Sequence, residues 1–321
     1  MSGGPFHDGE RLVQKATGED VLALRNGRFI STTLSANSER MLGIATTLNI
    51  AVSDAEGRVW SFLANGPEGL VARADDKTVY LNRTEMTVPS ARWTMVSAGA
   101  PIGLVAMDLT SARRFRINGS VNEVTPERVT IDVAQTCPNC PKYIQQRLPV
   151  ADKRYQGVAP ASGSDLPDNL ADLIRQADTF FVASKNPDGD HDASHRGGYP
   201  GFVNVKGNQL IVPDYFGNSM FMTLGNLALE PRAGITFVDF DTGAQLNLTG
   251  HATLNLEGRM AHDGADGRYW TFDIEAWQLT PHRPEPAWKL GAYSRFNPPL
   301  ETGQGLPFRP ISVSALAVFL W

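Results

Sequence analysis

The sequence has few cysteines, no excess of positive charge and no long apolar run, and each absence narrows what the protein can be. Its 321 residues contain 29 lysines and arginines against 34 acidic residues, which gives a net charge of −5. Nucleic-acid binding normally needs a basic face, so this balance gives no support to such a partner. No stretch reaches the roughly 20 apolar residues of a membrane-spanning helix, and the apolar end, Ile311–Trp321, is much shorter.

The segment Met1–Asp20 is polar and lacks the apolar core of a secretory signal peptide. We therefore expect a cytoplasmic protein that binds neither nucleic acid nor a membrane. A hydrophobic content of 42% with 20% charged residues is typical of a globular chain. This length suits two domains of ordinary size or one large one.

The two cysteines, Cys137 and Cys140, form a single CxxC sequence. Such a pair can be redox-active, or it can supply half of a zinc site. A zinc site of this type needs a second pair of ligands, and the sequence has no second CxxC. The interpretation we favour is a turn with two reduced thiols, and we expect no metal.

Short apolar and β-branched runs, separated by turn signals, occur along the whole chain and predict a mainly β protein with short helices. The predicted strands are Leu48–Ser53, Val59–Ala64, Thr78–Asn82, Ile102–Leu109, Arg114–Val124, Arg128–Val133, Thr179–Ser184, Gln209–Pro213, Gly234–Phe240, Gln245–Leu256 and Tyr269–Leu279. The predicted helices are Asp8–Thr17, Ser90–Ala98, Pro141–Arg147, Leu166–Ala177 and Asn218–Leu229.

The two halves of the chain repeat one another. Pro101–Thr110 lies over Arg232–Asp241, and matched residues recur at one offset of 131 positions: Gly103 and Gly234, Asp108 and Asp239, Gly119 and Gly250. Turns and strands follow in the same order in both halves. We therefore predict two tandem copies of one β-rich unit of about 130 residues.

The copies differ at a polar cluster, Ser194–Gly197. In our alignment this cluster lies over Ser61–Ala64, so apolar residues replace His195 and Arg196 in the first copy. The planar fork of an arginine suits a phosphate, and a glycine lets the backbone approach a ligand. We predict an anion site in the second copy that the first has lost. The alternative is that Arg196 is an ordinary surface arginine.

Seven segments of the second copy carry a resemblance to a known family. They are Asp178–Ser184, Ser194–Val203, Leu210–Tyr215, Gly217–Met220, Thr223–Asn226, Pro231–Gly234 and Thr249–Gly250. In this order they resemble the pyridoxamine 5′-phosphate oxidase-like FMN-binding split barrels. The first copy, with Asn139–Ile144, resembles the front half of a tandem subgroup of that superfamily. The resemblance implies a fold of two tandem split barrels.

This resemblance and the composition suggest four parts. Residues 1–148 would form a degenerate split barrel, and residues 149–165, rich in proline, glycine, serine and aspartate, a linker. Residues 166–300 would form the FMN-binding barrel, and residues 301–321 a C-terminal tail. The site could form within one chain or between the second barrels of two chains, and we expect a homodimer.

The family implies FMN laid across a barrel–barrel interface. Its phosphate would contact Ser194 and Arg196, and Asn218 and Ser219 would open a helix whose N-terminus attracts an anion. Simple N-capping is the alternative for that pair. No arginine or lysine occurs from residue 207 through 231, so Arg196 would carry the charge nearly alone, with help at most from Lys185.

The flavin ring would need backbone amides, a side-chain amide and an apolar cover. In the family these positions correspond to Val212–Asp214, Gln245 and Trp270 or Trp277, although core packing is the commoner fate of a tryptophan in a strand. The complete set expected to bind the cofactor is Ser194, His195, Arg196, Gly197, Val212, Pro213, Asp214, Asn218, Ser219, Thr223, Gln245 and Trp270.

The resemblance implies an FMN-dependent oxidoreductase of unknown substrate. Reduced nicotinamide or a flavin reductase would supply the electrons. The flavin itself carries the chemistry, so no catalytic acid or base is expected. One alternative is a non-enzymatic haem- or flavin-binding protein on the same fold, and another is a deazaflavin-dependent reductase. Residues 281–286 are only a loose echo of the substrate segment of true pyridoxamine phosphate oxidases, which argues against that activity.

Overall fold

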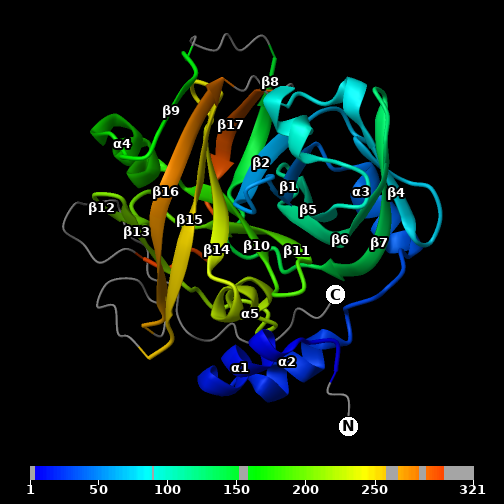
Figure 1. Ribbon diagram of the computed structural model, residues 1–321, viewed down its shortest axis with the longest axis horizontal. Coiled ribbons are helices and arrows are strands. Elements are labelled where there is room, and N and C mark those ends of the chain that lie inside the picture. Colours follow the sequence, from blue (N-terminus) through cyan, green and yellow to red (C-terminus); the bar gives the residue numbers. More distant parts are fainter. Residues whose placement is uncertain (1–3, 89, 152–157, 258–266, 282–286, 300–321) are drawn as a thin grey trace.

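A computed structural model describes residues 4–88, 90–151, 158–257, 267–281 and 287–299. Within these ranges the protein is mainly β, with five α-helices and two large antiparallel sheets that lie side by side (Figure 1). The predicted fold class is therefore confirmed. None of the helices in the described ranges has both the length and the apolar character needed to cross a membrane.

Each repeat forms one of the two sheets. The first contains β1 (Thr47–Ser53), β2 (Val59–Asn65), β3 (Val71–Arg73), β4 (Thr78–Asn82), β5 (Pro101–Asp108), β6 (Arg113–Val124) and β7 (Arg128–Pro138). The second contains β10 (Thr179–Lys185), β11 (His191–Gly197), β12 (Asn204–Lys206), β13 (Gln209–Pro213), β14 (Arg232–Asp239), β15 (Ala244–Asn255) and β16 (Tyr269–Pro281). Their spatial orders, β2-β1-β5-β6-β7-β4-β3 and β11-β10-β14-β15-β16-β13-β12, are the same pattern twice. The predicted tandem repeat is thus a repeat of topology.

Two matched glycines show why the repeat is visible in the sequence. Gly119 in β6 and Gly250 in β15 both lie where the ladder shifts register. A Cβ atom at either position would collide with a carbonyl oxygen of the next strand, that of Asp132 or Asp273. Both barrels therefore need a glycine at this bulge, because another side chain would separate the paired strands.

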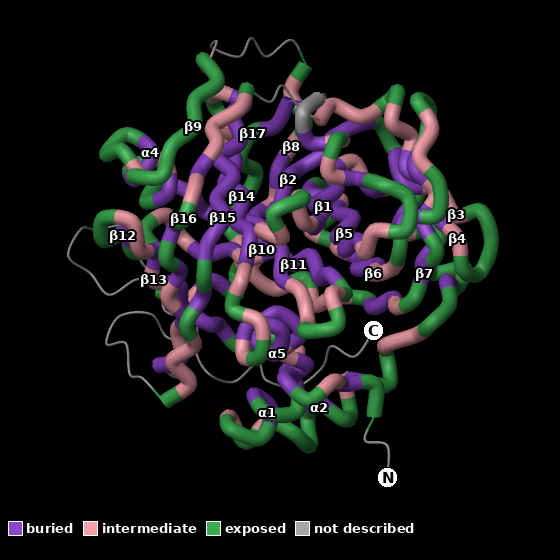
Figure 2. Tube along the Cα trace, viewed as in Figure 1, coloured by how far each residue is buried: buried purple, intermediate pink, exposed green. Residues whose placement is uncertain are grey.

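The two barrels pack against each other within one chain. A Cβ at Gly103 of β5 would lie 2.7 Å from the carbonyl oxygen of His191 in β11, and a Cβ at Gly234 of β14 would lie 2.7 Å from the amide nitrogen of Ser61 in β2. The contact is therefore reciprocal, like that of a two-fold dimer. The strands where the sheets meet are buried along most of their length (Figure 2).

The ladders correct one detail of the repeat alignment. Gly103 pairs with Ala51, which pairs with Ser61, whereas Gly234 pairs with Ala183, which pairs with Ala193. Ser61 is thus the counterpart of Ala193, and our alignment of Ser61 with Ser194 is wrong by one residue. The correct counterparts of Ser194, His195 and Arg196 are Phe62, Leu63 and Ala64. Successive strand residues face opposite sides, so this shift decides which residues occupy equivalent places.

The helices are α1 (Asp8–Thr17), α2 (Asp20–Gly27), α3 (Ala36–Gly43), α4 (Asp168–Gln176) and α5 (Met222–Leu229). Although α1 and α2 precede the first barrel, α1 lies against α5 of the second barrel and α2 packs on α1 (Figure 1). Gly9 of α1 and Gly225 of α5 let the two backbones come close enough that a Cβ on either would clash. The N-terminal segment therefore belongs structurally to the second barrel.

Two predicted helices differ in the structure. Pro141–Arg147 is a turn followed by β8 (Gln146–Val150), which pairs with β17 (Ala287–Ala292), so the helix predicted there is wrong. The helix predicted from Asn218 begins only at Met222. In both cases the polar residues before the strand or helix lie in a loop. The spacing of apolar residues does not distinguish such a loop from the first turn of a helix.

Three other predicted segments have different outcomes. Ser90–Met95 is a short 3₁₀ helix. Within the predicted linker 149–165, β9 (Ala161–Gly163) pairs with β16. The predicted tail, 301–321, lies outside the described residues.

Candidate functional site

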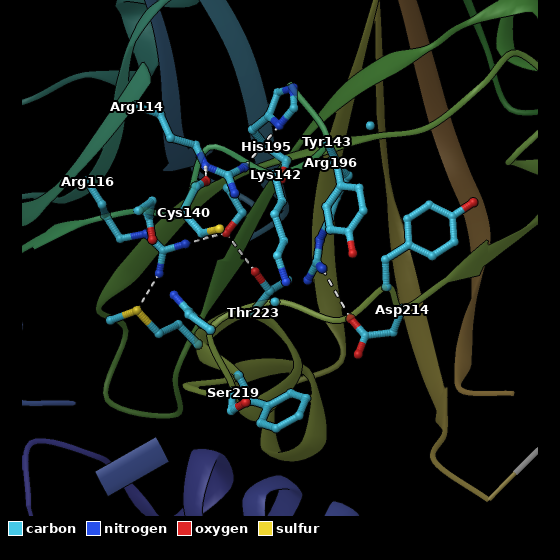
Figure 3. Close-up of a pocket in the computed structure, with 18 of the residues that line it drawn as sticks. Arg114, Arg116, Cys140, Lys142, Tyr143, His195, Arg196, Asp214, Ser219 and Thr223 are labelled. Carbon is cyan, nitrogen blue, oxygen red and sulfur yellow. Dashed lines mark hydrogen bonds and ion pairs between the residues drawn. The ribbon is translucent and has the colours of Figure 1, made fainter. Parts of the chain in front are cut away.

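A cavity of about 100 Å³ lies between the barrels, where the edge strand β11 meets β6 (Figure 3). Nine of the twelve predicted cofactor residues line it: Ser194, His195, Arg196, Gly197, Pro213, Asp214, Asn218, Ser219 and Thr223. The first barrel adds residues that were not predicted: Arg114, Arg116, Asn139, Cys140, Lys142 and Tyr143. The cavity is therefore shared by both halves of the chain.

Arg116 of β6 connects the two barrels at the cavity. One Nη donates to Ser194 Oγ at 2.5 Å, and the other lies 3.3 Å from Asp192 Oδ1 and 2.6 Å from Met222 Sδ. Ser194 Oγ is in turn 2.7 Å from the hydroxyl of Thr223. The Nε of Arg116 is buried without a partner among the described residues, so this guanidinium retains a donor.

Arg114, two residues earlier on the same face of β6, is held entirely by neutral acceptors. It donates to the carbonyl oxygen of Cys140 at 2.9 Å, and to the carbonyl oxygen and Nδ1 of His195 at 3.1 and 3.0 Å. Burial, with repulsion from Arg196 and Arg116, lowers the pKa of Arg114 to about 10. Arg114 is still charged at neutral pH, and no carboxylate pairs with it in the described ranges.

The imidazole of His195 contacts Arg114 and helps to hold that side chain in place. Its ring packs edge-on against Phe181, with centroids 5.4 Å apart. Burial, with repulsion from Arg114 and Arg196, holds the pKa of the imidazole well below its usual range. An arginine can only donate, so Nδ1 is the acceptor and the neutral ring carries its proton on Nε2.

Arg196 comes from β11 and donates to Asp214 Oδ1 at 3.1 Å. Asp214 also faces Arg268, whose Nε lies 3.6 Å from Oδ2, and Arg268 pairs with Glu19 of the N-terminal segment. Burial raises the pKa of Asp214 despite these two arginines. The lining of the cavity thus combines four cationic side chains, Arg114, Arg116, Lys142 and Arg196, with one carboxylate.

Backbone strain is concentrated around the same cavity. Tyr143, Ser219 and Phe221 have φ values of 66°, 60° and 58°, and only one other non-glycine residue in the described ranges, Ala112, has a positive φ. Such conformations cost roughly 1–3 kcal/mol each and persist where the surroundings hold them, often at ligand sites. The Tyr143 hydroxyl donates to the carbonyl oxygen of Phe216 at 2.8 Å and so ties the two loops together.

Asn218 and Ser219 line the cavity, but they do not cap a helix. The Asn218 carbonyl oxygen accepts from Asn26 at 2.8 Å, and the Ser219 hydroxyl donates to Glu19. The N-cap of α5 is Phe221, which makes no side-chain cap hydrogen bond. The prediction that Asn218 and Ser219 open the helix is therefore wrong, because the chain passes through two positive φ values before the helix begins.

Three predicted cofactor residues do not line the cavity. Val212 and Trp270 are fully buried in the core of the second barrel. Gln245 joins the barrels, because its Nε2 donates to the Leu63 carbonyl oxygen at 2.9 Å and its Oε1 accepts from the Leu63 amide at 3.0 Å. Gln245 thus makes at the opposite interface the contact that its counterpart Arg114 makes with His195.

Other suggested residues also have structural partners. Trp277 donates to the carbonyl oxygen of Asp165 at 2.8 Å. Lys185 lies 3.4 Å from the carbonyl oxygen of Gly57, away from the cavity lining. Neither side chain contributes to the candidate site.

The sequence contained a pattern that pointed to two arginines of the first barrel, and our sequence analysis did not use it. Arg114 and Arg116 alternate along a predicted strand, so they share one face. Their counterparts in the second copy, Gln245 and Asn247, are neutral. The expectation that Arg196 carries the charge nearly alone is therefore corrected by cations from the other copy.

The cysteines are free thiols, as favoured from the sequence. Cys137 is fully buried, and burial raises the pKa of its thiol to about 11. Such a thiol is inert at neutral pH. No group of potential metal ligands is found among the described residues.

The sequence profile of the pyridoxamine 5′-phosphate oxidase family matches residues 166–282. This range begins before α4 and includes every strand from β10 to β16. The match therefore covers the second barrel. The first barrel repeats the strand order of this domain and completes its cavity, although it lies outside the match.

Solved structures are only distantly similar. HupZ of Group A Streptococcus is 17% identical, with a TM-score of 0.30 over 37% of this chain and 97% of its own. HutZ, a haem storage protein from Vibrio cholerae, is 10% identical, with a TM-score of 0.25 over 41% and 99%. MrkH of K. pneumonia, solved with c-di-GMP, is 9% identical, with a TM-score of 0.21 over 78% and 87%. Among curated proteins no match was found.

Proposed function

We propose that this cavity binds the phosphate of FMN and that the protein is an FMN-dependent oxidoreductase. One observation carries the proposal: Arg114 and Arg116 of one barrel converge with Arg196 of the other on a cavity with a single lining carboxylate. Guanidinium groups bind phosphate through paired, charge-assisted hydrogen bonds. Asp192 and Asp214 pair with only two of the three arginines.

The residues present suit the phosphate end of such a cofactor. The Nε atoms of Arg116 and Arg196 are buried donors without partners in the described ranges. The Ser194 hydroxyl accepts from Arg116 and is hydrogen-bonded to the Thr223 hydroxyl. A volume of about 100 Å³ accepts a phosphate group, whereas pockets for whole small ligands span roughly 300–1,000 Å³. The flavin ring would therefore need further space, beside the loops that carry Tyr143 and Asp214.

Bound FMN would supply the electron-transfer chemistry. The protein's own contribution would be to hold the phosphate with Arg116, Arg196, Ser194 and Thr223, and to hold Arg114 in place with His195. Reduced nicotinamide or a flavin reductase would serve as electron donor. Both walls of the cavity come from one chain, so the expected homodimer is not needed to complete the site, and light scattering of the purified protein tests it.

A haem-binding function has one feature in its favour, because His195 Nε2 is buried without a partner in the described part of the chain. Arg114 donates to the other ring nitrogen, so Nε2 carries the proton and would have to lose it to ligate iron. This arrangement favours FMN. A haem Soret band with no uptake of flavin would reverse the assignment, and competition between FMN and a deazaflavin separates the remaining alternative.

The first test is the visible spectrum and an FMN titration of the purified protein. Replacing Arg196 by alanine should weaken FMN binding by about 1–3 kcal/mol, the value expected for a lost hydrogen bond to a charged group. The matched control is Arg113→Ala, because Arg113 is exposed next to Arg114 and does not line the cavity. Absence of any FMN uptake contradicts the function, and equal affinities of the two variants would remove Arg196 from the site.

A further inference from the structure

A buried carboxyl of the N-terminal helix lies behind the cavity and has no part in the proposed binding. Glu10, in the first turn of α1, is 3% exposed. Its Oε2 accepts from the backbone amide of His7 at 2.9 Å. The close crossing of α1 and α5 traps the side chain, because a Cβ on Gly225 would lie 2.5 Å from Glu10 Cγ. Glu10 therefore cannot reach solvent while α1 is in place.

No positive charge neutralises Glu10 directly. The Nε2 of His7 is 3.8 Å away, but that nitrogen donates to Asn226 Oδ1 at 2.9 Å, and Nδ1 accepts from the Gly9 amide. Accepting at one nitrogen and donating at the other is the pattern of a neutral imidazole. The other charged groups that act on Glu10 are Arg11 on α1, Asp192 on β11 and Arg116 on β6, and α5 contributes no charged side chain.

Asp192 connects Glu10 with the cavity. Its Oδ1 accepts from Arg116 at 3.3 Å and from Asn118 at 2.5 Å, and its Oδ2 accepts from Asn226 at 2.7 Å. Asn226 thus bridges the His7 cap of α1 and the carboxylate that holds Arg116. Glu10 is thus connected through His7 and Asn226 to Asp192, and the arginine that Asp192 holds reaches Ser194 in the cavity.

Glu10 and Asp192 are both buried and belong to one hydrogen-bonded network, so a negative charge on one disfavours a negative charge on the other. Asp192 has three donors, whereas Glu10 has one backbone amide, so the surroundings of Glu10 stabilise a negative charge less. Burial and then the negative charge of Asp192 raise the pKa of Glu10 to about 8. Arg116 thus faces one negative charge below that pH and two above it.

We propose that Glu10 is a positioning residue of the anion site: its protonated carboxyl leaves Asp192 as the single counter-charge of Arg116, and loss of that proton weakens anion binding in the cavity. This inference rests on the proposed function, because it concerns the same Arg116. Linkage is reciprocal, so a bound anion must make Glu10 hold its proton more tightly. The N-terminal helix would in this way couple ligand binding to proton uptake.

The test measures FMN affinity between pH 7.5 and 9.5, where a phosphate monoester with a second pKa near 6 keeps a constant charge. The wild-type affinity should fall about fivefold or more across this range, and Glu10→Gln should remove most of the fall. The control Glu123→Gln replaces an exposed glutamate of β6, and its FMN affinity should fall with pH as the wild-type affinity does. Equal slopes in the wild type and Glu10→Gln overturn this inference and leave the proposed function intact. Absence of binding at every pH overturns both.

A second measurement uses the wild-type protein alone and then with FMN. At pH 7 the wild type should show the infrared carbonyl band of a protonated carboxyl, and the band should disappear by about pH 9.5. Addition of FMN should move its loss to higher pH. A protein without this band at pH 7 carries an ionised Glu10, and that result would refute the inference even if Glu10→Gln failed to fold.

Discussion

Gly234→Ala should destabilise the protein by about 3 kcal/mol, toward the upper end of the usual cost of overpacking. Gly234 lies on β14 where the barrels meet. A Cβ there would approach the Ser61 amide nitrogen and the Trp60 Cα and carbonyl carbon, each at 2.7 Å. All three atoms are backbone, so no side chain can rotate away and the barrels themselves must separate.

Separation of the barrels also breaks hydrogen bonds between them. Thr236 donates to the Ser61 carbonyl oxygen at 2.6 Å, Asn247 donates to the same oxygen at 2.8 Å, and Thr249 donates to the Val59 carbonyl oxygen at 2.9 Å. These groups are buried, so lost partners are not readily replaced by water. Urea denaturation at constant pH measures the effect.

Two glycine variants make this experiment specific. Gly103→Ala, the reciprocal position on β5, should cost a similar amount, because its Cβ would meet the backbone of His191–Ala193. Gly43→Ala is the control, since a Cβ at the end of α3 has no other atom within 4 Å and should change stability by less than about 1 kcal/mol. If Gly234→Ala is as stable as the control, the barrels do not pack in this reciprocal way.

Ser194→Phe should abolish FMN binding, with a loss of affinity of at least about 100-fold, equivalent to roughly 2.7 kcal/mol. The substitution copies the first barrel, where the counterpart of Ser194 is Phe62. Phe62 is fully buried and packs edge-on against Trp93 at 6.4 Å. At position 194 the ring would occupy the cavity and break the hydrogen bonds to Arg116 and Thr223.

FMN titration with circular dichroism on the same samples separates loss of the cavity from loss of the fold. Ser97→Phe is the control, because Ser97 is exposed on the first barrel and does not line the cavity. The control should bind as the wild type does. A folded Ser194→Phe protein that still binds FMN tightly would place the cofactor elsewhere.

Much of the architecture could be predicted from the sequence, because the same steric requirements recur at equivalent positions of the two copies. Gly119 and Gly250 are needed at equivalent bulges, and Gly103 and Gly234 are needed at equivalent contacts, so their constant offset reflected two identical folds. The alignment of Ser61 with Ser194 was one residue out. The β1–β2 and β10–β11 hairpins have loops of equal length, so the error came from matching two serines by residue type, which the strand register does not support.

The site was predicted only on its second-barrel side. Ser194, Arg196, Asp214 and Thr223 lie close together as expected. Gln245 was assigned to the flavin because the family has an amide in that strand, yet here it clamps Leu63 of the other barrel. Asn218 and Ser219 were assigned to a helix that begins later. Each of these residues has contacts that depend on what packs against it.

The amino-acid pattern alone established a mainly β chain, its internal duplication and the polar cluster in the second copy, because these follow from strand periodicity, turn residues and spacing. It did not reveal that Arg114 and Arg116 would face that cluster, or that Glu10 would be buried behind Asp192. Arg116 and Ser194 are 78 positions apart, and Glu10 and Gly225 are 215 apart. Residues this distant meet only through the packing of one barrel, or of the N-terminal helix, against the other, and that packing creates the cationic cavity.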